Sequence, residues 1–520
     1  MLVKTDPRLR LAALLARPTS AASLAFIRIA FGLVVLWEAW RYLDPGHGWV
    51  DAYYVEPSLF FGYWPFEWVS PLPAPWIQLV FVALGIAGLA VSTGLFYRVC
   101  APAVFVLLSY IFLLDKTRYL NHWYLMVLLA AVLTVVPAHR FWSLDARRRP
   151  ELASRSVPLW SIVLVRAQVA VPYIMGGIAK LNSDWLAGRP LGEWVSDDTD
   201  FPLIGALFDE GWFVLALAYG ALAFDLLVVP LLFTRWGRPV AMGAAVVFHL
   251  MNDRLFSIGV FPWMMILATT VLLPSDWPER VIARLRSRPS MASGAFLVGA
   301  WIGGVTGARF PGRFMLLPTV VSALGVGLVA FLAIEAWNRS DGGEPALDMG
   351  APPSEGSTRP RARPHRMGRE PGSVVVWGLA LWIALQVMIP LRHLAIPGDV
   401  HWTEEGHRFS WHMKLRDKDA EASYLVAAPS GRTWELDTSM WLTATQERKV
   451  AARPDLIVQF AHAIEAEFAA AGHGDVAVTA DVRVSLNQRE PARLIDPAVD
   501  LTGIEYPWTA PAPWILPLDK

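Results

Sequence analysis

The chain has 520 residues, of which 55% are hydrophobic and only 17% are charged. Its mean hydropathy of +0.40 exceeds what water-soluble globular chains usually reach, so the composition excludes an ordinary soluble protein. The 45 basic and 45 acidic side chains cancel, and this zero net charge gives no reason to expect a nucleic-acid partner. Cys100 is the single cysteine, which excludes an intramolecular disulfide.

Apolar runs of about 20 residues, the length that crosses a bilayer as a helix, recur through the first three quarters of the sequence. The 25 tryptophans fit a protein with two membrane interfaces, because indole prefers the headgroup level. Because several runs are short or contain polar residues, we expect ten or eleven spans. They lie near residues 23–41, 75–97, 99–114, 121–138, 157–180, 211–233, 239–251, 258–273, 293–308, 315–337 and 373–391.

Positive charge predicts the orientation of these spans, because Lys and Arg accumulate on the cytoplasmic side of a membrane. Residues 43–97 contain no Lys or Arg and are expected outside, whereas Lys116 and Arg118 are exceptions in a short outside loop. We therefore expect a cytoplasmic N-terminus and a C-terminal domain outside. The basic clusters that define the cytoplasmic side are the N-terminus, 147–149, Arg235 with Arg238, 280–288 and 359–369.

The composition changes after the predicted spans. Residues 338–371 are rich in Gly, Pro, Ser and Arg and resemble a disordered linker. Residues 405–416 and 476–486 alternate like half-buried strands, and 453–471 are predicted to form one amphipathic helix. We predict an α-helical polytopic membrane protein with a C-terminal β-rich extracytoplasmic domain. Its parts are a multi-pass domain at 1–290, extra spans and linker at 291–371, a last span at 372–391 and the β-rich domain at 392–520.

Polar side chains inside the predicted spans mark candidate functional positions, because a charge inside a bilayer is costly and normally has a partner or a role. His249 and Asn252 lie three residues apart and therefore on one helix face. The candidate groups are Asn121 with His122, Lys180 with Arg166, Asp225 alone, and His249 with Asn252, Asp253 and Arg254.

Each group also has a structural explanation. His122 and Lys180 lie near span ends, where a side chain can extend to the interface, and for Lys180 this explanation is as good as a functional one. Asp225 and Arg166 fit a structural ion pair better than a catalytic pair.

His249 could also be a core histidine at a break between two half-spans. A broken helix is tolerated in a membrane where its backbone lines a cavity, so residues 249–262 are a candidate pocket wall. The sequence contains no metal-ligand spacing, Gly-rich phosphate loop or Ser or Cys nucleophile motif.

Ordered motifs around these polar residues carry a resemblance to one family. Residues 177–185, Gly-Ile-Ala-Lys-Leu-Asn-Ser-Asp-Trp, are similar to Gly-Val-Lys-Lys-Leu-Asp-Ala-Asp-Trp of the vitamin K-dependent gamma-glutamyl carboxylases. The chain resembles the bacterial-type, HTTM-domain members of that family over residues 20–275 and 373–515. The other matching segments are Asn121-His122, 139–145, 248–252, 255–259, 484–487 and 496–500.

The resemblance implies an enzyme that oxygenates vitamin K hydroquinone to its epoxide with O2 and uses the strong base so formed to carboxylate protein Glu with CO2. Lys180 falls on the family's catalytic base and would deprotonate the hydroquinone, which requires a neutral amine. His122 would assist the oxygenation, and Asn121, His249 and Asn252 would orient the quinone. The expected partners are the lipid bilayer, a lipid-soluble quinol and a Glu-containing protein or peptide, and no metal is expected.

Three departures from the family keep alternatives open. Residues 390–393, Pro-Leu-Arg-His, replace the Pro-Tyr-Ser-His of animal members, the animal disulfide cannot form, and residues 290–370 have no counterpart. The Ala/Arg/Gly-rich composition indicates a bacterial membrane protein, for which menaquinol is an alternative quinol. The alternative functions are a quinol epoxidase or oxidase without carboxylation, and a non-catalytic scaffold for a lipid ligand. A transporter is expected to carry inverted repeats, and we find none.

Overall fold

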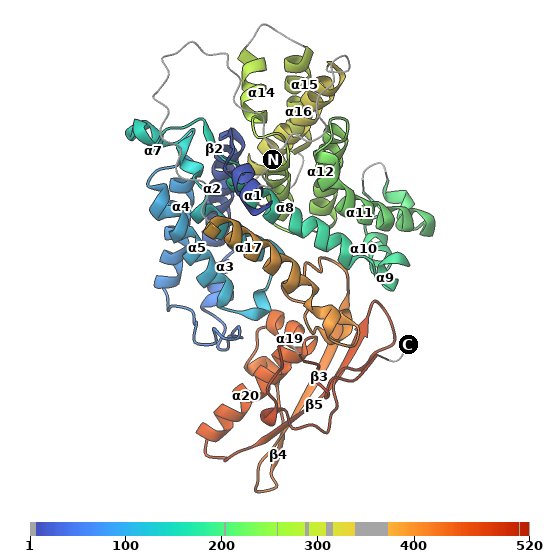
Figure 1. The fold of residues 1–520 in the computed structure, drawn as a ribbon. Helices are drawn as coiled ribbons and strands as arrows, with labels where there is room; N and C mark the ends of the chain where they lie inside the picture. Colours follow the sequence, from blue (N-terminus) through green and yellow to red (C-terminus); the bar gives the residue numbers. More distant parts are fainter. Residues whose placement is uncertain are drawn as a thin grey trace.

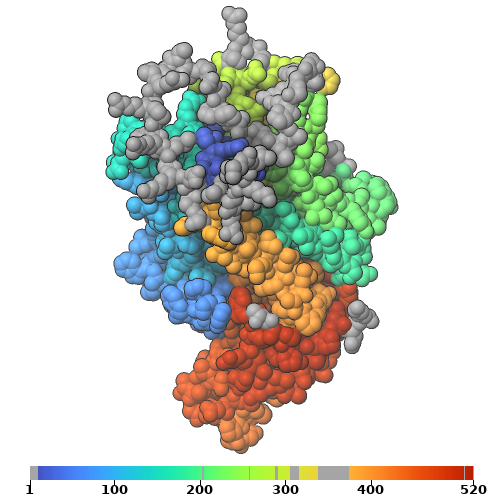
Figure 2. Space-filling view, viewed as in Figure 1, coloured from blue at the N-terminus to red at the C-terminus, as the bar shows by residue number. Residues whose placement is uncertain are grey.

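The computed structural model describes residues 7–201, 204–256, 258–286, 291–307, 316–338, 373–508 and 510–518. A large helical region stands above a smaller C-terminal domain that contains the main sheet (Figure 1). The space-filling view shows the C-terminal domain, in red, packed directly against the helical region (Figure 2). The predicted linker at 338–371 lies, apart from its first residue, outside the residues that the structure describes.

Six helices within the described ranges are long and apolar enough to cross a membrane. Each predicted span coincides with a helix, which confirms the helical polytopic class, although only these six meet both the length and the hydropathy expected of a span. The six are α2 (Ala22–Leu43), α4 (Trp76–Thr93), α8 (Leu159–Ala179), α11 (Gly211–Leu232), α16 (Leu316–Asn338) and α17 (Ser373–Leu391). The remaining predicted spans are the shorter helices α5 (Tyr97–Leu113), α6 (Asn121–Val135), α13 (Phe261–Thr269) and α15 (Met291–Gly307), and α12 (Gly237–Phe256).

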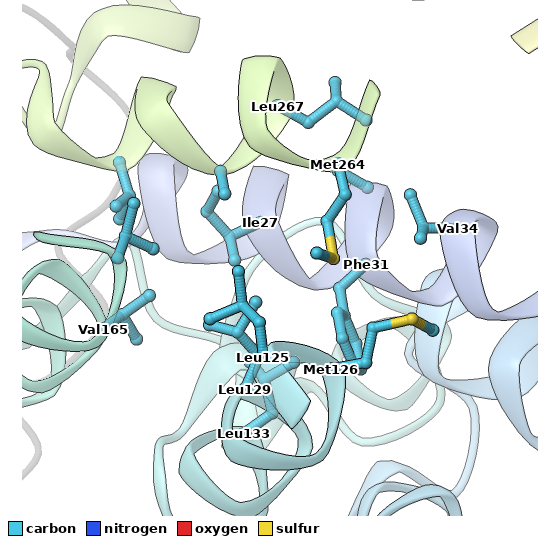
Figure 3. Close-up of a cluster of buried hydrophobic side chains, with 14 of the residues drawn as sticks. Ile27, Phe31, Val34, Leu125, Met126, Leu129, Leu133, Val165, Met264 and Leu267 are labelled. Carbon is cyan, nitrogen blue, oxygen red and sulfur yellow. The ribbon is translucent and has the colours of Figure 1, made fainter. Parts of the chain in front are cut away.

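The core of the helical region forms around α2. Side chains of α2, α6, α8 and α13 converge there, among them Ile27, Phe31, Leu129 and Met264 (Figure 3). Gly32 brings α2 close to α4, because a Cβ at this position would lie 2.5 Å from the carbonyl oxygen of Gly88. Small residues at such crossings allow the backbones of membrane helices to approach and gain dispersion contacts.

Short elements precede or connect the spans. Among them are α1 (Pro7–Ala16), α3 (Trp49–Tyr54), η1 (Lys116–Arg118), α7 (Leu144–Arg148), α9 (Ser183–Leu186), α10 (Leu191–Ser196) and α14 (Trp277–Arg286). The antiparallel strands β1 (Pro18–Ser20) and β2 (Ser156–Pro158) pair beside the start of α2.

The C-terminal domain is a four-stranded antiparallel sheet in the order β4-β3-β5-β6, with helices beside it. Val426 and Val482 of the sheet are buried against Phe460 and Ile464. The predicted strand at 476–486 and helix at 453–471 are confirmed. The elements are α18 (Val400–Thr403), β3 (Lys418–Ala427), β4 (Thr433–Glu435), α19 (Ala444–Ala451), α20 (Pro454–Ala470), β5 (Ala477–Leu486) and β6 (Ala492–Arg493).

The predicted strand at 405–416 is wrong, because this segment forms consecutive turns between α18 and β3. Glu404, Phe409, Trp411 and Lys414 have φ angles of 64°, 65°, 60° and 52°. Side chains other than glycine rarely adopt this left-handed region, and each such residue costs about 1–3 kcal/mol unless its surroundings hold it there. Apolar and polar residues alternate in this segment because successive side chains of the turns are buried to different extents. No strand pairing is involved.

Buried ion pairs attach the C-terminal domain to the helical region. The carboxylate of Asp455 lies 3.1 Å from Lys116 Nζ and accepts a 2.6 Å hydrogen bond from Arg408 Nη1. Burial raises the pKa of Asp455, but Arg408 and Lys116 outweigh burial and lower this pKa below its ordinary value. The guanidinium of Arg118 lies 3.3 Å from the ring centroid of Tyr53. Both basic exceptions in the predicted outside loop are therefore engaged in structural contacts.

A second contact forms at the end of α9 nearest the C-terminal domain. Asp184 accepts hydrogen bonds of 2.8 and 2.5 Å from Arg489 and of 2.6 Å from the amide of Asn487. The two contacts fix the C-terminal domain at points far apart in the sequence of the helical region.

Replacement of Asp455 by Ala is expected to destabilise the protein by about 3–5 kcal/mol, because it leaves Lys116 and Arg408 buried without their carboxylate. Thermal unfolding in detergent measures this loss. Asp481→Ala is the matched control, since it breaks an exposed pair with Arg493 that is worth about 1 kcal/mol or less. Equal losses in the two variants would contradict the structural role of Asp455.

Candidate active site

A cavity of about 90 Å³ lies at the end of α8 nearest the C-terminal domain. Its wall is mainly apolar, with six polar or charged side chains among aromatic and aliphatic ones. The polar lining residues are Tyr173, Lys180, Asp225, His249, Asn252 and Lys414, and the apolar ones include Trp185, Trp194, Phe248, Phe256, Phe261 and Met413.

Lys180 terminates α8 and points to α11. Its Nζ lies 2.6 Å from Asp225 Oδ2, and the two residues are 5% and 3% exposed. Gly177 makes this approach possible, because a Cβ there would lie 2.6 Å from the side chain of Leu226 on α11. Lys180 is therefore buried against a carboxylate, and the interpretation that it extends to the membrane interface is wrong.

The predicted ion pair between Arg166 and Asp225 is also wrong. Arg166 donates hydrogen bonds of 2.9 and 2.6 Å to the carbonyl oxygens of Val271 and Leu273. Positions 166 and 180 are separated by about 21 Å along α8 at the helical rise of 1.5 Å per residue. Arg166 therefore caps carbonyls beyond α13 and is too far from the Lys180 amine for direct contact.

His249 is held by a hydrogen-bonded chain. The hydroxyl of Thr269 donates to the carbonyl of Met265 at 2.7 Å, so its oxygen is free to accept from the hydroxyl of Tyr173 at 2.6 Å. Tyr173 then accepts from His249 Nε2 at 2.9 Å, which assigns the proton of the neutral ring to Nε2. His249 Nδ1 has no hydrogen-bond partner within the described part of the chain and is available as an acceptor.

Asn121 lies near the C-terminal domain. Its Oδ1 accepts from the Tyr119 hydroxyl at 3.0 Å, and the Tyr119 oxygen accepts from the backbone N–H of Phe409 at 2.8 Å. The start of α6 is thus attached to the turn that follows α18.

His122 does not line the cavity around Lys180. Its ring centroid lies 6.3 Å from that of Phe261, and the Phe261 centroid lies 6.1 Å from that of His249. Phe261 lines the cavity and lies between the two histidines. The structure brings Lys180, His249 and Asn252 together, with Asp225 as the partner of the lysine, and places His122 behind an aromatic ring.

Sequence reasoning missed two residues contributed by the turn at 404–416. The Lys414 ammonium lies 4.8 Å from the ring centroids of Trp194 and Phe256, a favourable cation–π geometry. The Met413 methyl lies 3.3 Å from the position that a Cβ at Gly176 would take. The signal was the density of His, Arg and Glu after the last span, which a half-buried strand rarely carries.

Glu404 stabilises this turn. It accepts a 2.6 Å hydrogen bond from Arg416 and lies 3.1 Å from Lys418 Nζ and 4.0 Å from Arg453 Nε. Burial raises the pKa of Glu404, but the three cations outweigh burial and lower this pKa from 4.5 to about 2. The strained turn that lines the cavity is therefore held by charge as well as by packing.

Known family descriptions match both the helical region and the C-terminal domain. The description "HTTM domain" matches residues 16–277, and the description "Vitamin K-dependent gamma-carboxylase, lumenal domain" matches residues 372–520. The chain belongs to the vitamin K-dependent gamma-carboxylase family. The first match contains Lys180, Asp225, His249 and Asn252, and the second contains the turn that completes the cavity of this carboxylase-family protein. No solved structure matches the chain.

Within the described ranges, no group of three or more His, Cys, Asp and Glu side chains could hold a metal ion. The prediction that this family member uses no metal remains a prediction.

The acid stability of the turn is predicted to depend on Glu404. Since its pKa falls from 4.5 in the unfolded chain to about 2 in the folded chain, Glu404 stabilises the fold fully above pH 4.5, and this contribution disappears as the pH falls towards 2. The contribution is about 3 kcal/mol. The stability difference between the wild-type protein and Glu404→Gln, measured by thermal unfolding from neutral to acid pH, should shrink accordingly. Glu435→Gln, at an exposed position, is the control, and a pH-independent difference for Glu404→Gln would refute the assignment.

Proposed function

We propose that this protein is a quinol-dependent, gamma-glutamyl carboxylase-like membrane enzyme, which couples oxygenation of a hydroquinone to carboxylation of Glu in a protein or peptide. The observation that carries the proposal is the buried amine of Lys180, paired with Asp225 in an apolar cavity of a carboxylase-family chain. An ionisable side chain buried inside a membrane bundle beside its partner is a functional-site candidate on physical grounds.

The cavity residues fit a lipid-soluble quinol. Aromatic side chains can contact a planar ring, His249 Nδ1 can accept a hydrogen bond from a ring hydroxyl, and the Asn252 amide can donate to or accept from a ring oxygen. A bound reduced vitamin K or menaquinol would supply the O2-dependent chemistry that drives carboxylation. The cavity residues would hold the ring, exclude water and accept the proton of its hydroxyl.

Lys180 is the proposed base, and Asp225 governs whether it can act. An ammonium cannot accept a proton, so the Lys180 amine must be neutral when the quinol hydroxyl donates. Transfer of one proton from Nζ to Asp225 Oδ2 over their 2.6 Å contact would give a neutral amine and a carboxylic acid. Such an exchange removes two opposite charges from a low-dielectric site, where charge is costly.

His122 is proposed to assist oxygenation from beyond Phe261, and Asn121 to support it from the start of α6. Because Phe261 separates His122 from His249, this role requires the ligand or the Phe261 ring to extend the cavity towards α6. We place the N-terminus in the cytoplasm and the C-terminal domain outside a bacterial plasma membrane.

The decisive assay uses the purified protein in nanodiscs with vitamin K hydroquinone or menaquinol, O2, labelled bicarbonate and a Glu-containing peptide. Epoxide together with fixed label establishes the coupled reaction. Epoxide without label supports an epoxidase that does not carboxylate the peptide. If neither product forms while a quinol still binds, the protein is a lipid-ligand scaffold and the proposal fails.

Replacement of Lys180 by Ala is expected to lower epoxide formation about 100-fold or more, the usual contribution of a positioned base. Lys180→Arg is the matched variant, because it keeps a cation beside Asp225 but stays protonated. We expect Lys180→Arg to insert and unfold like the wild-type protein and to form no epoxide. Full epoxide formation by either variant would exclude Lys180 as the base.

A further inference from the structure

The segment that precedes α4, residues 64–76, carries large apolar side chains on the surface of the protein. We call it the aromatic loop. Only Glu67 and Ser70 among its 13 residues are polar, and four of the others are proline. Contiguous exposed apolar surface of this kind marks contact with a partner or with a membrane. The exposed fractions are 60% for Trp64, 41% for Phe66, 78% for Trp68, 44% for Leu72 and 61% for Trp76.

Hydrogen bonds to α5 fix the depth of the aromatic loop. The hydroxyl of Tyr110 donates to the carbonyl of Ser70 at 3.0 Å and accepts from the N–H of Leu72 at 3.0 Å. Tyr110 precedes Leu113, the end of α5 nearest the C-terminal domain, by three residues, and aromatic side chains on a helix point back towards its N-terminus. The loop is therefore held beside α5, at a level that this membrane helix crosses.

The helix that follows the aromatic loop presents a lipid-facing stripe. The 18 residues of α4 span about 27 Å, slightly less than the hydrocarbon core of about 30 Å. The segment that adjoins the start of α4 therefore falls within the membrane interface, where its apolar surface extends the stripe. The stripe consists of exposed residues three or four apart, which lie on one helix face, and they are Trp76, Leu79, Val82, Ile86 and Leu89.

We propose that the aromatic loop inserts into the membrane leaflet on the side of the C-terminal domain, although it does not span the membrane. Its tryptophans would lie among the lipid headgroups and the upper acyl chains, the layer that indole prefers. The loop contains no Lys or Arg, and its single acidic residue, Glu67, lies within electrostatic range of Lys116. Lipid is the occupant that fits, because the exposed surface continues the lipid-facing stripe of α4 at the same depth.

The aromatic loop also contacts the C-terminal domain. Phe61, just before the loop, is 1% exposed within the core of that domain, and the amide of Gln459 donates to the carbonyl of Gly62 at 3.1 Å. Trp64 packs against Trp508, with their ring centroids 5.8 Å apart. An inserted loop would therefore hold the C-terminal domain at the membrane surface. This inference does not depend on the quinol reaction.

The test places one nitroxide label on the full chain in nanodiscs of phosphatidylcholine and phosphatidylglycerol. Cys100→Ala removes the single native cysteine, and Trp68→Cys then carries the label. Relaxation of the label by O2, which concentrates in lipid, is compared with relaxation by a water-soluble nickel chelate. We expect O2 to dominate several-fold for Trp68→Cys, as for Ile86→Cys on the stripe of α4. The nickel chelate should dominate for Ser430→Cys, in the turn between β3 and β4 far from the helical region (Figure 1).

A second labelled position in the aromatic loop, Leu72→Cys, should respond like Trp68→Cys. Thermal unfolding close to that of Cys100→Ala shows that each labelled variant folds. The proposal is overturned if the nickel chelate dominates at both loop positions, because the loop then lies in water. It is also overturned if neither reagent reaches the two labels, because a protein surface, from a partner or from a second copy of this chain, then covers the loop.

Discussion

The ion pair of Lys180 and Asp225 is the constraint on which the arrangement around the cavity depends. Each of these charges would cost several kcal/mol in an apolar bundle without the other, so the end of α8 and the middle of α11 have to meet. Gly177 removes the side chain that would keep these helices apart. Once the helices meet, Tyr173 on α8 lies opposite α12 and α13, where it bonds to His249 and Thr269. The same contact therefore positions the lysine and orients the histidine.

The cavity is completed by the C-terminal domain. Met413 and Lys414 belong to the turn after α18, whose four left-handed non-glycine residues would relax to ordinary backbone conformations if nothing held them. Glu404 holds the turn from the C-terminal domain, and the hydrogen bond from Phe409 to Tyr119 holds it from the helical region. The two family descriptions match separate parts of the chain, residues 16–277 and 372–520, yet the cavity needs side chains from both. Attachment of the two domains through Asp455 and Asp184 is thus a requirement of the site.

The helices and the candidate position of Lys180 could be predicted from the sequence on different grounds. A span is a local property, because about 20 apolar residues are sufficient to identify it, and Lys180 lies in an unbroken motif. The partner of Lys180 could not be predicted, because Asp225 is remote in the sequence. Whether Asp225 pairs with Lys180 or with Arg166 depends on the depth of each cation along α8. The strand predicted at 405–416 failed for a related reason. An alternation of apolar and polar residues reports only which side chains are buried. In this turn the burial comes from tertiary contacts, which the local sequence does not reveal.

The two basic residues of the short loop before α6 show how burial changes the meaning of a charge. The rule that places Lys and Arg in the cytoplasm applies to cations that stay in water near the membrane. Lys116 is 8% exposed and paired with Asp455, and Arg118 stacks on Tyr53, so neither is a free interfacial cation. The carboxylate that neutralises Lys116 belongs to the C-terminal domain, whereas Arg118 is held within the helical region by the Tyr53 ring. Their presence on the predicted outer side is therefore consistent with the orientation that the other basic clusters indicate, and for Lys116 it reflects attachment of the domain.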